Sequence, residues 1–287
     1  MSAYTLLVVL AHPDDESFGM GGTLALYAAR GAAVHLVCAT RGEVGEMDPH
    51  LLEGYASVAD RREAELRCAA GALGLAGIHF LNYRDSGMPG SPDNSHPQAL
   101  AAQPLDAVAE NVVCYIRELK PQVVLTFDPI GGYRHPDHIA IHNATVRAFE
   151  QAGNPAFAPE SLPVYQPERL YFHTMPRGFL KVAVRLLPLI GRDPHRFGTN
   201  HDVDLVSIAE VDFPTHARID IRSVGEKKLQ AGACHASQGG GRMGGGPVSA
   251  IMRLFDGSET FMRAYPSVQP GEKLERDLLA QVRPAVD

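Results

Sequence analysis

Short apolar runs alternate with longer segments of helical periodicity over residues 1–175. The first run, LLVVL at residues 6–10, is apolar at every position rather than at every second one. Such a run suits a central strand that helices cover on both faces. Further runs that are mostly apolar follow at residues 33–39, 78–81, 122–127 and 169–172. The alternation predicts an α/β fold, with a mostly parallel sheet and helices on both of its faces.

The segments between these runs carry the expected helices. Helical spacing of apolar residues, bounded by capping or breaking residues, occurs at 22–30, 57–73, 104–119 and 138–152. We therefore expect residues 1–175 to form one layered domain. The pattern loosens beyond it, so residues 176–287 are expected to form a C-terminal extension or small lobe that packs on the same domain and adds loops to its pocket.

The net charge is mildly acidic, because 26 Lys and Arg stand against 33 Asp and Glu, which gives −7. Nucleic-acid-binding proteins normally carry the opposite balance, so no nucleic-acid partner is expected. The four cysteines, Cys38, Cys68, Cys114 and Cys234, are isolated from one another in the sequence. This spacing signals neither a cysteine zinc site nor a disulfide framework.

No apolar stretch approaches the roughly 18 residues of a membrane span. The apolar run at residues 5–11 has no basic residue before it and acidic residues directly after it, unlike a signal peptide. Together with the isolated cysteines, this predicts a cytoplasmic protein without a membrane span.

Histidine is unusually frequent, with 13 in 287 residues. Two His-Pro-Asp segments stand out, HPDDE at residues 12–16 and YRHPDH at residues 133–138. Each follows the carboxyl end of an expected strand, and open α/β sheets collect their ligands at that edge. We therefore expect the two segments to meet at one rim of the sheet.

These segments contain a set of residues suited to a hydrolytic metal site. A divalent ion such as zinc binds imidazole nitrogen and carboxylate oxygen, with three protein ligands and a fourth position open to water. His12, Asp15 and His138 would supply that set. His142 follows His138 by four residues, a spacing that also permits metal binding, so it is the alternative third ligand.

Hydrolysis at such a site also needs a base and a group that assists the leaving atom or the developing oxyanion. A metal lowers the pKa of bound water, and a neighbouring carboxylate then removes a proton as water attacks a carbonyl. Asp14 and Glu16 are both candidates for this base. His135 is the candidate to protonate the leaving group or to stabilise the oxyanion.

These residues carry a resemblance to a known family. The segment LAHPDDE at residues 10–16, GGT at residues 21–23 and HPDH at residues 135–138 together resemble the LmbE-like, PIG-L-type N-acetylglucosaminyl deacetylases. That family includes the deacetylases of mycothiol and bacillithiol synthesis and the mycothiol S-conjugate amidase. The resemblance covers residues 4–175 in order and implies a Rossmann-like hydrolase that removes acetyl from an amino sugar.

Carried over by motif position, the resemblance implies zinc as the cofactor, with Fe²⁺ or another divalent metal as alternatives for the same site. It implies that His12, Asp15 and His138 are the metal ligands. It also implies that Asp14, rather than Glu16, is the general base.

The resemblance assigns further roles around the metal. His135 would be the general acid or oxyanion stabiliser, Asp137 would orient it, and Tyr133 would lie near the oxyanion. Arg62 and Asp85 would bind sugar hydroxyls. The late segment HASQ at residues 235–238 also resembles one common in the family, without an assigned role.

The expected function is hydrolysis of the N-acetyl group of an N-acetylglucosamine-containing conjugate, a small-molecule partner. One alternative is amide cleavage in a thiol-cofactor S-conjugate, and another is a non-catalytic metal-binding or sugar-binding protein. A nucleotide-binding protein is disfavoured, because the acidic residues at 14–16 would repel a pyrophosphate at the turn before GMGG at residues 19–22. The sequence leaves the oligomeric state open, a homo-oligomer included.

Overall fold

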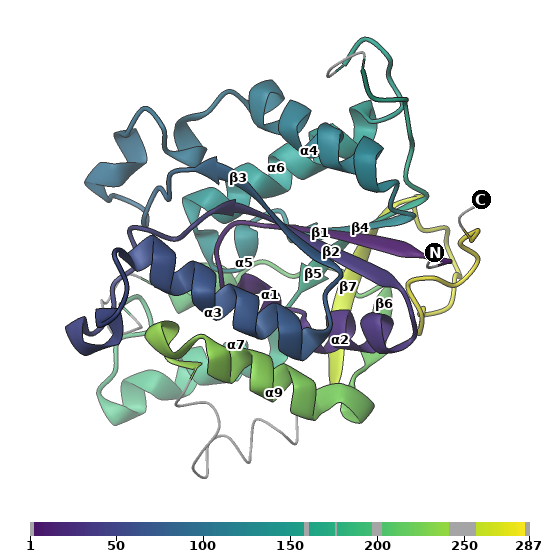
Figure 1. The fold of residues 1–287 in the computed structure, drawn as a ribbon. Coiled ribbons are helices and arrows are strands. Elements are labelled where there is room, and N and C mark those ends of the chain that lie inside the picture. The colour runs from purple at the N-terminus through teal and green to yellow at the C-terminus, as the bar shows by residue number, and fades with distance from the viewer. Residues whose placement is uncertain (1–2, 158–160, 176, 197–202, 241–256, 285–287) are drawn as a thin grey trace.

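The computed structural model describes residues 3–157, 161–175, 177–196, 203–240 and 257–284. Within these ranges, seven strands form one sheet in the order β3-β2-β1-β4-β5-β7-β6 (Figure 1). The strands are β1 (Thr5–Leu10), β2 (Ala33–Thr40), β3 (Gly77–Tyr83), β4 (Val123–Phe127), β5 (Arg169–Thr174), β6 (Ala217–Asp220) and β7 (Ser258–Tyr265).

The first five strands pair with one another in parallel, which confirms the predicted α/β fold. β1 lies between β2 and β4, and its residues 6–10 are fully or almost fully buried. This explains why the run is apolar at every position: side chains on both faces of the strand pack under helices. The order 3-2-1-4-5 places loops from both halves of the parallel sheet along the same carboxyl edge.

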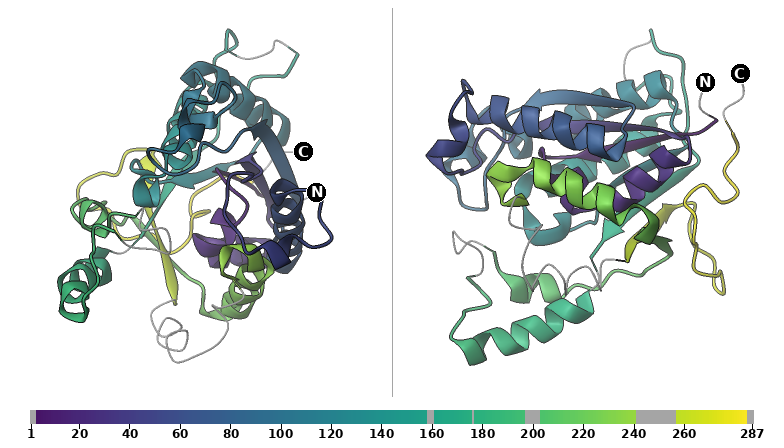
Figure 2. Two further views of the ribbon diagram at one scale, coloured as in Figure 1. Left: turned by 90° about the vertical axis from the view of Figure 1, so that its left-hand side faces the viewer. Right: turned by 60° about the horizontal axis from the view of Figure 1, so that its bottom comes forward.

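Helices cover both faces of the sheet (Figures 1 and 2). α4 and α6 pack together on one face, and α2, α3 and α9 pack together on the other. The helices are α1 (Asp15–Phe18), α2 (Gly21–Ala29), α3 (Val58–Leu73), α4 (Leu105–Leu119), α5 (Gly131–Arg134), α6 (Pro136–Gln151), α7 (Arg177–Leu186), α8 (Leu205–Ala209) and α9 (Gly225–Cys234). No helix in the described ranges is long and apolar enough to cross a membrane.

Local sequence sets the ends of the two helices that carry site residues. The Ser57 hydroxyl accepts a hydrogen bond from the Asp60 N–H and caps α3, which ends at Gly74 in the left-handed region with φ 78°. α6 begins earlier than the predicted residue 138. His135 is its N-cap, and Pro136 occupies the first turn, where a missing N–H costs nothing.

The C-terminal residues complete the same sheet. β7 runs antiparallel between β5 and β6, and α9 packs against α3. The sequence pattern did not identify β6 or β7, because both lie in the part of the chain where the periodicity loosens. Of the glycine-rich run at residues 239–246, only Gly239 and Gly240 lie among the described residues.

The structure contradicts the expectation from the cysteine spacing. Cys68 on α3 and Cys234 at the end of α9 form a disulfide across 166 residues of sequence. Cys38 and Cys114 are free. The pairing depends on the packing of two helices that are distant in the chain, so cysteine spacing alone gives no signal of it.

We predict that Cys68→Ser lowers the free energy of unfolding by about 2–5 kcal/mol, because the bond constrains a very long loop of the unfolded chain. Thermal unfolding of the oxidised protein measures the change, and Cys114→Ser is the control with a free, half-buried thiol. Equal melting temperatures for wild type and Cys68→Ser would contradict the prediction.

Candidate active site

The predicted site residues gather at the carboxyl edge of the parallel strands. Three segments start at this edge: the loop after β1, the loop after β3 and the α5–α6 segment after β4. α3 reaches the same edge from one face of the sheet (Figure 1). The structure brings together residues of all four segments: His12, Asp14 and Asp15; Tyr133, His135, Asp137 and His138; Asp85; and Arg62.

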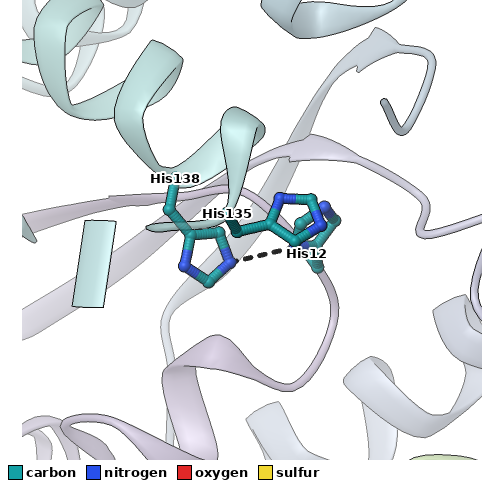
Figure 3. A group of neighbouring side chains, drawn as sticks. All are labelled: His12, His135 and His138. Atoms are coloured by element: carbon teal, nitrogen blue, oxygen red, sulfur yellow. Dashed lines mark hydrogen bonds between the residues drawn. The ribbon is translucent and has the colours of Figure 1, made fainter. Parts of the chain in front are cut away.

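Three of these residues point their ligand atoms at one another. His12 Nδ1 lies 3.1 Å from His138 Nε2 (Figure 3). Asp15 Oδ1 lies 3.2 Å from His138 Nε2, and Asp15 Oδ2 lies 3.7 Å from His12 Nδ1. Bonds of about 2.0–2.1 Å to a tetrahedral zinc ion place ligand atoms about 3.3 Å apart. The two distances to His138 Nε2 match this value, and they leave Asp15 Oδ1 as the oxygen suited to a metal, because Asp15 Oδ2 accepts the His12 backbone N–H at 2.7 Å.

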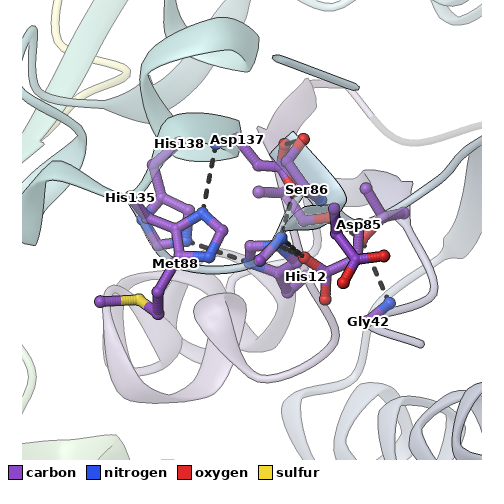
Figure 4. Close-up of polar contacts among 12 residues, drawn as sticks. His12, Gly42, Asp85, Ser86, Met88, His135, Asp137 and His138 are labelled. Atoms are coloured by element: carbon purple, nitrogen blue, oxygen red, sulfur yellow. Dashed lines mark hydrogen bonds and ion pairs between the residues drawn. The ribbon is translucent and has the colours of Figure 1, made fainter. Parts of the chain in front are cut away.

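The second ring nitrogen of His12 faces a different group of side chains (Figure 4). His12 Nε2 lies 3.1 Å from Asp137 Oδ2 and 3.5 Å from Asp85 Oδ1. Asp137 itself is fully buried, and its carboxylate accepts hydrogen bonds from the Ser86 N–H and hydroxyl. A metal-bound histidine commonly donates its other N–H to a carboxylate, so this arrangement leaves Nδ1 free to bind a cation.

Among the described residues, two groups of three buried side chains have ligand atoms that all lie within 4.8 Å of one another, and Asp15 is in neither: His12 with His135 and His138, and His12 with Asp85 and Asp137. Both share His12. In the second group, hydrogen bonds from Ser86 and Gly87 already occupy the two carboxylates. In the first, His135 Nδ1 accepts the Asp137 N–H, which leaves its Nε2 open, so these three histidines are an alternative ligand set. The set of His12, Asp15 and His138 has the ligand types of a hydrolytic zinc site.

His142, the alternative third ligand, is held elsewhere. Its Nδ1 lies 2.8 Å from the Phe127 carbonyl oxygen, and its ring packs edge-on against Phe172. It belongs to neither of the groups of clustered ligand atoms found among the described residues. One turn of α6 thus separates a residue that faces the site from one that faces the core.

The turn before α6 must pass close to His138. Gly131 adopts φ 63°, and a Cβ there would lie 2.6 Å from the His138 Cβ, so a larger residue would displace the helix. The Gly131 carbonyl lies 3.2 Å from His138 Nδ1. This contact leaves Nε2 pointing at His12 and Asp15.

His135 is oriented differently from the prediction. The predicted orienting group was the Asp137 side chain, but its carboxylate contacts His12 and Ser86. The Asp137 backbone N–H instead donates to His135 Nδ1 at 3.2 Å, as the N-cap bond of α6. A neutral His135 therefore carries its proton on Nε2.

Asp14 has an unusual backbone. Its φ of 132° is strained for a residue with a side chain. Arg62 holds this loop: its Nη2 donates to the Pro13 carbonyl at 2.8 Å and to Asp14 Oδ2 at 3.1 Å, and its Nη1 donates to the Gly42 carbonyl. The left-handed Gly42 makes room, since a Cβ there would lie 2.1 Å from Arg62 Nη1.

Burial raises the pKa of the Asp14 carboxyl to about 6, although the nearby Arg62 guanidinium opposes the change. A group with this pKa can accept a proton near neutral pH and release it again. Glu16, the other candidate base, is fully buried and hydrogen-bonds to Ser17 and His235. It lines neither of the two cavities that Asp14 lines.

The other titratable groups are shifted by burial and by one another. Burial opposes ionisation of Asp15, but His138 and His12 outweigh it and hold the pKa of Asp15 below its usual range. Burial, with a smaller contribution from the neighbouring His12 and His138, lowers the pKa of His135 to about 2. Burial and the carboxylates of Asp15 and Asp14 raise the pKa of Tyr133 well above its usual value.

Two cavities meet at Asp14 and Tyr133. One, of about 300 Å³, is lined by polar groups that include Arg62, Asp85 and His135. The other, of about 370 Å³, includes Phe18, Phe127 and Met175, and residues 258–260 of β7. β7, which the periodicity of the sequence does not indicate, therefore forms part of the wall of the site.

Residues 7–149 match the family model described as GlcNAc-PI de-N-acetylase, PIG-L. A 1D-myo-inositol 2-acetamido-2-deoxy-alpha-D-glucopyranoside deacetylase from Thermobifida fusca is 41% identical over 249 residues, which cover 83% of this chain and 84% of that protein. The protein of the same name from Acidothermus cellulolyticus is 38% identical over 97% of this chain and 95% of its own length.

The chain belongs to the PIG-L family. The N,N'-diacetylchitobiose deacetylase from Pyrococcus horikoshii, at 21% identity, matches with a TM-score of 0.61 over 94% of this chain and 88% of that one. At this identity, the match shows that the two proteins share a fold. The family assignment confirms the resemblance that the two His-Pro-Asp motifs indicated.

We predict that His138→Ala abolishes stoichiometric zinc binding, whereas His142→Ala retains it. Both residues lie on α6 and both are buried, so the pair separates ligation from damage to the helix. Metal analysis of the purified, zinc-loaded variants gives the result. Loss of zinc in His142→Ala with retention in His138→Ala would contradict the assignment.

Proposed function

We propose that this chain is a zinc-dependent deacetylase that hydrolyses the acetamide of N-acetylglucosamine joined to inositol or a similar polyol. The reaction breaks the amide C–N bond, adds the water oxygen to the acyl carbon, and releases acetate and a free amine. The convergence of His12, Asp15 and His138 beside Asp14 carries the proposal. The names of the relatives support the class of substrate.

His12 Nδ1, Asp15 and His138 Nε2 would hold the zinc ion, with Fe²⁺ or another divalent metal as alternatives. Such an ion lowers the pKa of a coordinated water to near 7 and polarises the amide carbonyl. The donor set of two imidazoles and one carboxylate suits this role. Asp137, through His12 Nε2, would fix which nitrogen of His12 faces the ion.

Asp14 is the proposed general base. Its carboxylate accepts the proton of the attacking water, and burial raises its pKa far enough that it can then return the proton to the leaving nitrogen. Arg62, 3.1 Å away, holds the carboxylate in place.

His135 is the proposed donor to the developing oxyanion. Since its Nδ1 accepts the backbone N–H of Asp137, its Nε2–H is the atom available for a hydrogen bond. Tyr133 shares the cavity with His135 and lies edge-on to His138, and its hydroxyl is the proposed second donor to the oxyanion. Asp85 and Arg62, on the polar cavity wall, are the proposed contacts of the sugar hydroxyls.

The cytoplasmic location stays a prediction. The Cys68–Cys234 disulfide removes the cysteine argument for it, because stable disulfides are uncommon in a reducing cytoplasm. The oligomeric state also stays open.

A panel of amides tests the proposed substrate class. The zinc-loaded protein is offered N-acetylglucosaminyl-inositol, free N-acetylglucosamine and a mycothiol S-conjugate, and the free amine released is measured. We expect the inositol conjugate to be hydrolysed with the highest kcat/KM. Preferential cleavage of the S-conjugate would favour the amidase alternative, and metal retention without any turnover would favour a non-catalytic protein.

We predict that Asp14→Asn lowers kcat by about 10²- to 10⁴-fold, the usual contribution of a general base, while the zinc content stays at that of wild type. Steady-state kinetics and metal analysis on the same preparation measure both. Undiminished kcat in Asp14→Asn would exclude Asp14 as the base.

We predict that Asp85→Asn raises KM for the inositol conjugate more than it lowers kcat, because a carboxylate acceptor for sugar hydroxyls is lost. The comparison with Asp93→Asn controls for general loss of charge in this loop, since Asp93 pairs with Arg84 outside both cavities. A change confined to kcat would assign Asp85 to the positioning of His12 instead.

A further inference from the structure

His235 and Glu16 form a buried pair that the proposed mechanism does not use, next to the backbone of Asp14. His235 Nε2 is 2.7 Å from Glu16 Oε1, and both side chains have 0% exposure. The two residues are 219 positions apart in the chain. Neither lines either of the two cavities that Asp14 lines, so neither can touch a substrate there.

Glu16 connects this pair to Asp14. Its Oε2 accepts the Asp14 backbone N–H at 3.0 Å, while its Oε1 also accepts the Ser17 hydroxyl at 2.5 Å. On the other side of the same residue, the Asp14 carbonyl accepts the N–H groups of Ser17 and Phe18, each at 3.0 Å. Glu16 therefore accepts the backbone N–H of Asp14, the residue with the strained φ of 132°.

A strained backbone persists only where the surrounding contacts over-determine it. For Asp14, Arg62 supplies contacts from the cavity side, and Glu16 supplies them from the core side. A carboxylate buried at this depth needs hydrogen-bond donors of its own. The His235 imidazole is such a donor, delivered from the end of α9.

We propose that His235 is a positioning residue for catalysis: it fixes the Glu16 carboxylate, which in turn keeps Asp14 in the backbone conformation that directs its side chain into the site. The role of Asp14 as the base rests on the proposed function. The contacts from His235 through Glu16 to the Asp14 N–H are independent of that proposal.

The neighbouring residue provides a matched control. Ser237 donates from its N–H and hydroxyl to the two Glu65 carboxylate oxygens at 2.9 and 2.6 Å. These bonds attach the same segment, residues 235–238, to α3 rather than to the loop that contains Asp14. Ser237→Ala therefore loosens the segment without removing a contact of Glu16.

The test compares four variants by kinetics on the inositol conjugate. We expect His235→Leu to lower kcat by about 10- to 100-fold, the effect of a small misplacement of a reacting group, with little change in KM or zinc content. His235→Gln, whose amide nitrogen can replace Nε2 as the donor, should recover most of kcat. The asparagine of His235→Asn is too short to reach Glu16, so kcat should stay low in that variant. Ser237→Ala should keep kcat near that of wild type.

The Gln and Asn variants keep the test decisive if His235→Leu fails to fold. Equal kcat in those two variants, or a loss in Ser237→Ala as large as that in His235→Leu, would overturn the positioning role. Both results would mean that His235 acts only by anchoring its segment.

A second measurement does not depend on activity. Hydrogen–deuterium exchange of the peptide that contains residues 13–18 is followed in the metal-free proteins. Protection should fall in His235→Leu and His235→Asn but not in Ser237→Ala. If wild type hydrolyses no amide in the panel, the proposed function fails, and the exchange result still decides whether His235 holds the Asp14 loop. Unchanged protection in His235→Asn would overturn the inference.

Discussion

The geometry of the site depends on how the His12 imidazole is held. Its Nε2 faces the buried Asp137 carboxylate, which Ser86 fixes in turn, and its Nδ1 faces Asp15 and His138. Because Asp137 and His138 are adjacent in the first turn of α6, one turn of helix supplies both the carboxylate that orients His12 and the third proposed ligand. The start of α6 at its His135 cap therefore sets the positions of both groups.

The second constraint is the backbone of Asp14. A residue that acts as a base must present its carboxylate to the cavity while its neighbour, Asp15, turns towards His12 and His138. The two successive carboxylates face different groups, and the backbone at Asp14 is strained, with φ 132°. Arg62 and Glu16 hold that conformation from opposite sides, so part of the stability of the fold is used to maintain the site.

The sequence predicted the parts of this arrangement that local patterns encode. The apolar run at residues 6–10 indicated the central strand, and the placement of both His-Pro-Asp segments after strands indicated a shared rim. Periodicity could not distinguish His138 from His142, because the difference lies in contacts with other elements: His142 Nδ1 meets the Phe127 carbonyl oxygen and its ring packs against Phe172.

Contacts between distant segments were beyond the reach of sequence patterns. The Asp137 side chain was expected to orient His135, but the fold places Ser86 and His12 against it. The Cys68–Cys234 bond and the pairing of β7 with β5 likewise join elements far apart in the chain. Such contacts have no periodicity, so only the three-dimensional packing shows them.

The most direct test of this account is the position of the metal. Crystals of the zinc-loaded protein, measured on both sides of the zinc absorption edge, locate the ion by its anomalous scattering. The account predicts one ion bound by His12 Nδ1, Asp15 and His138 Nε2. An ion bound instead by His12 Nε2 with Asp85 and Asp137, or a third histidine ligand from His135 or His142, would contradict it.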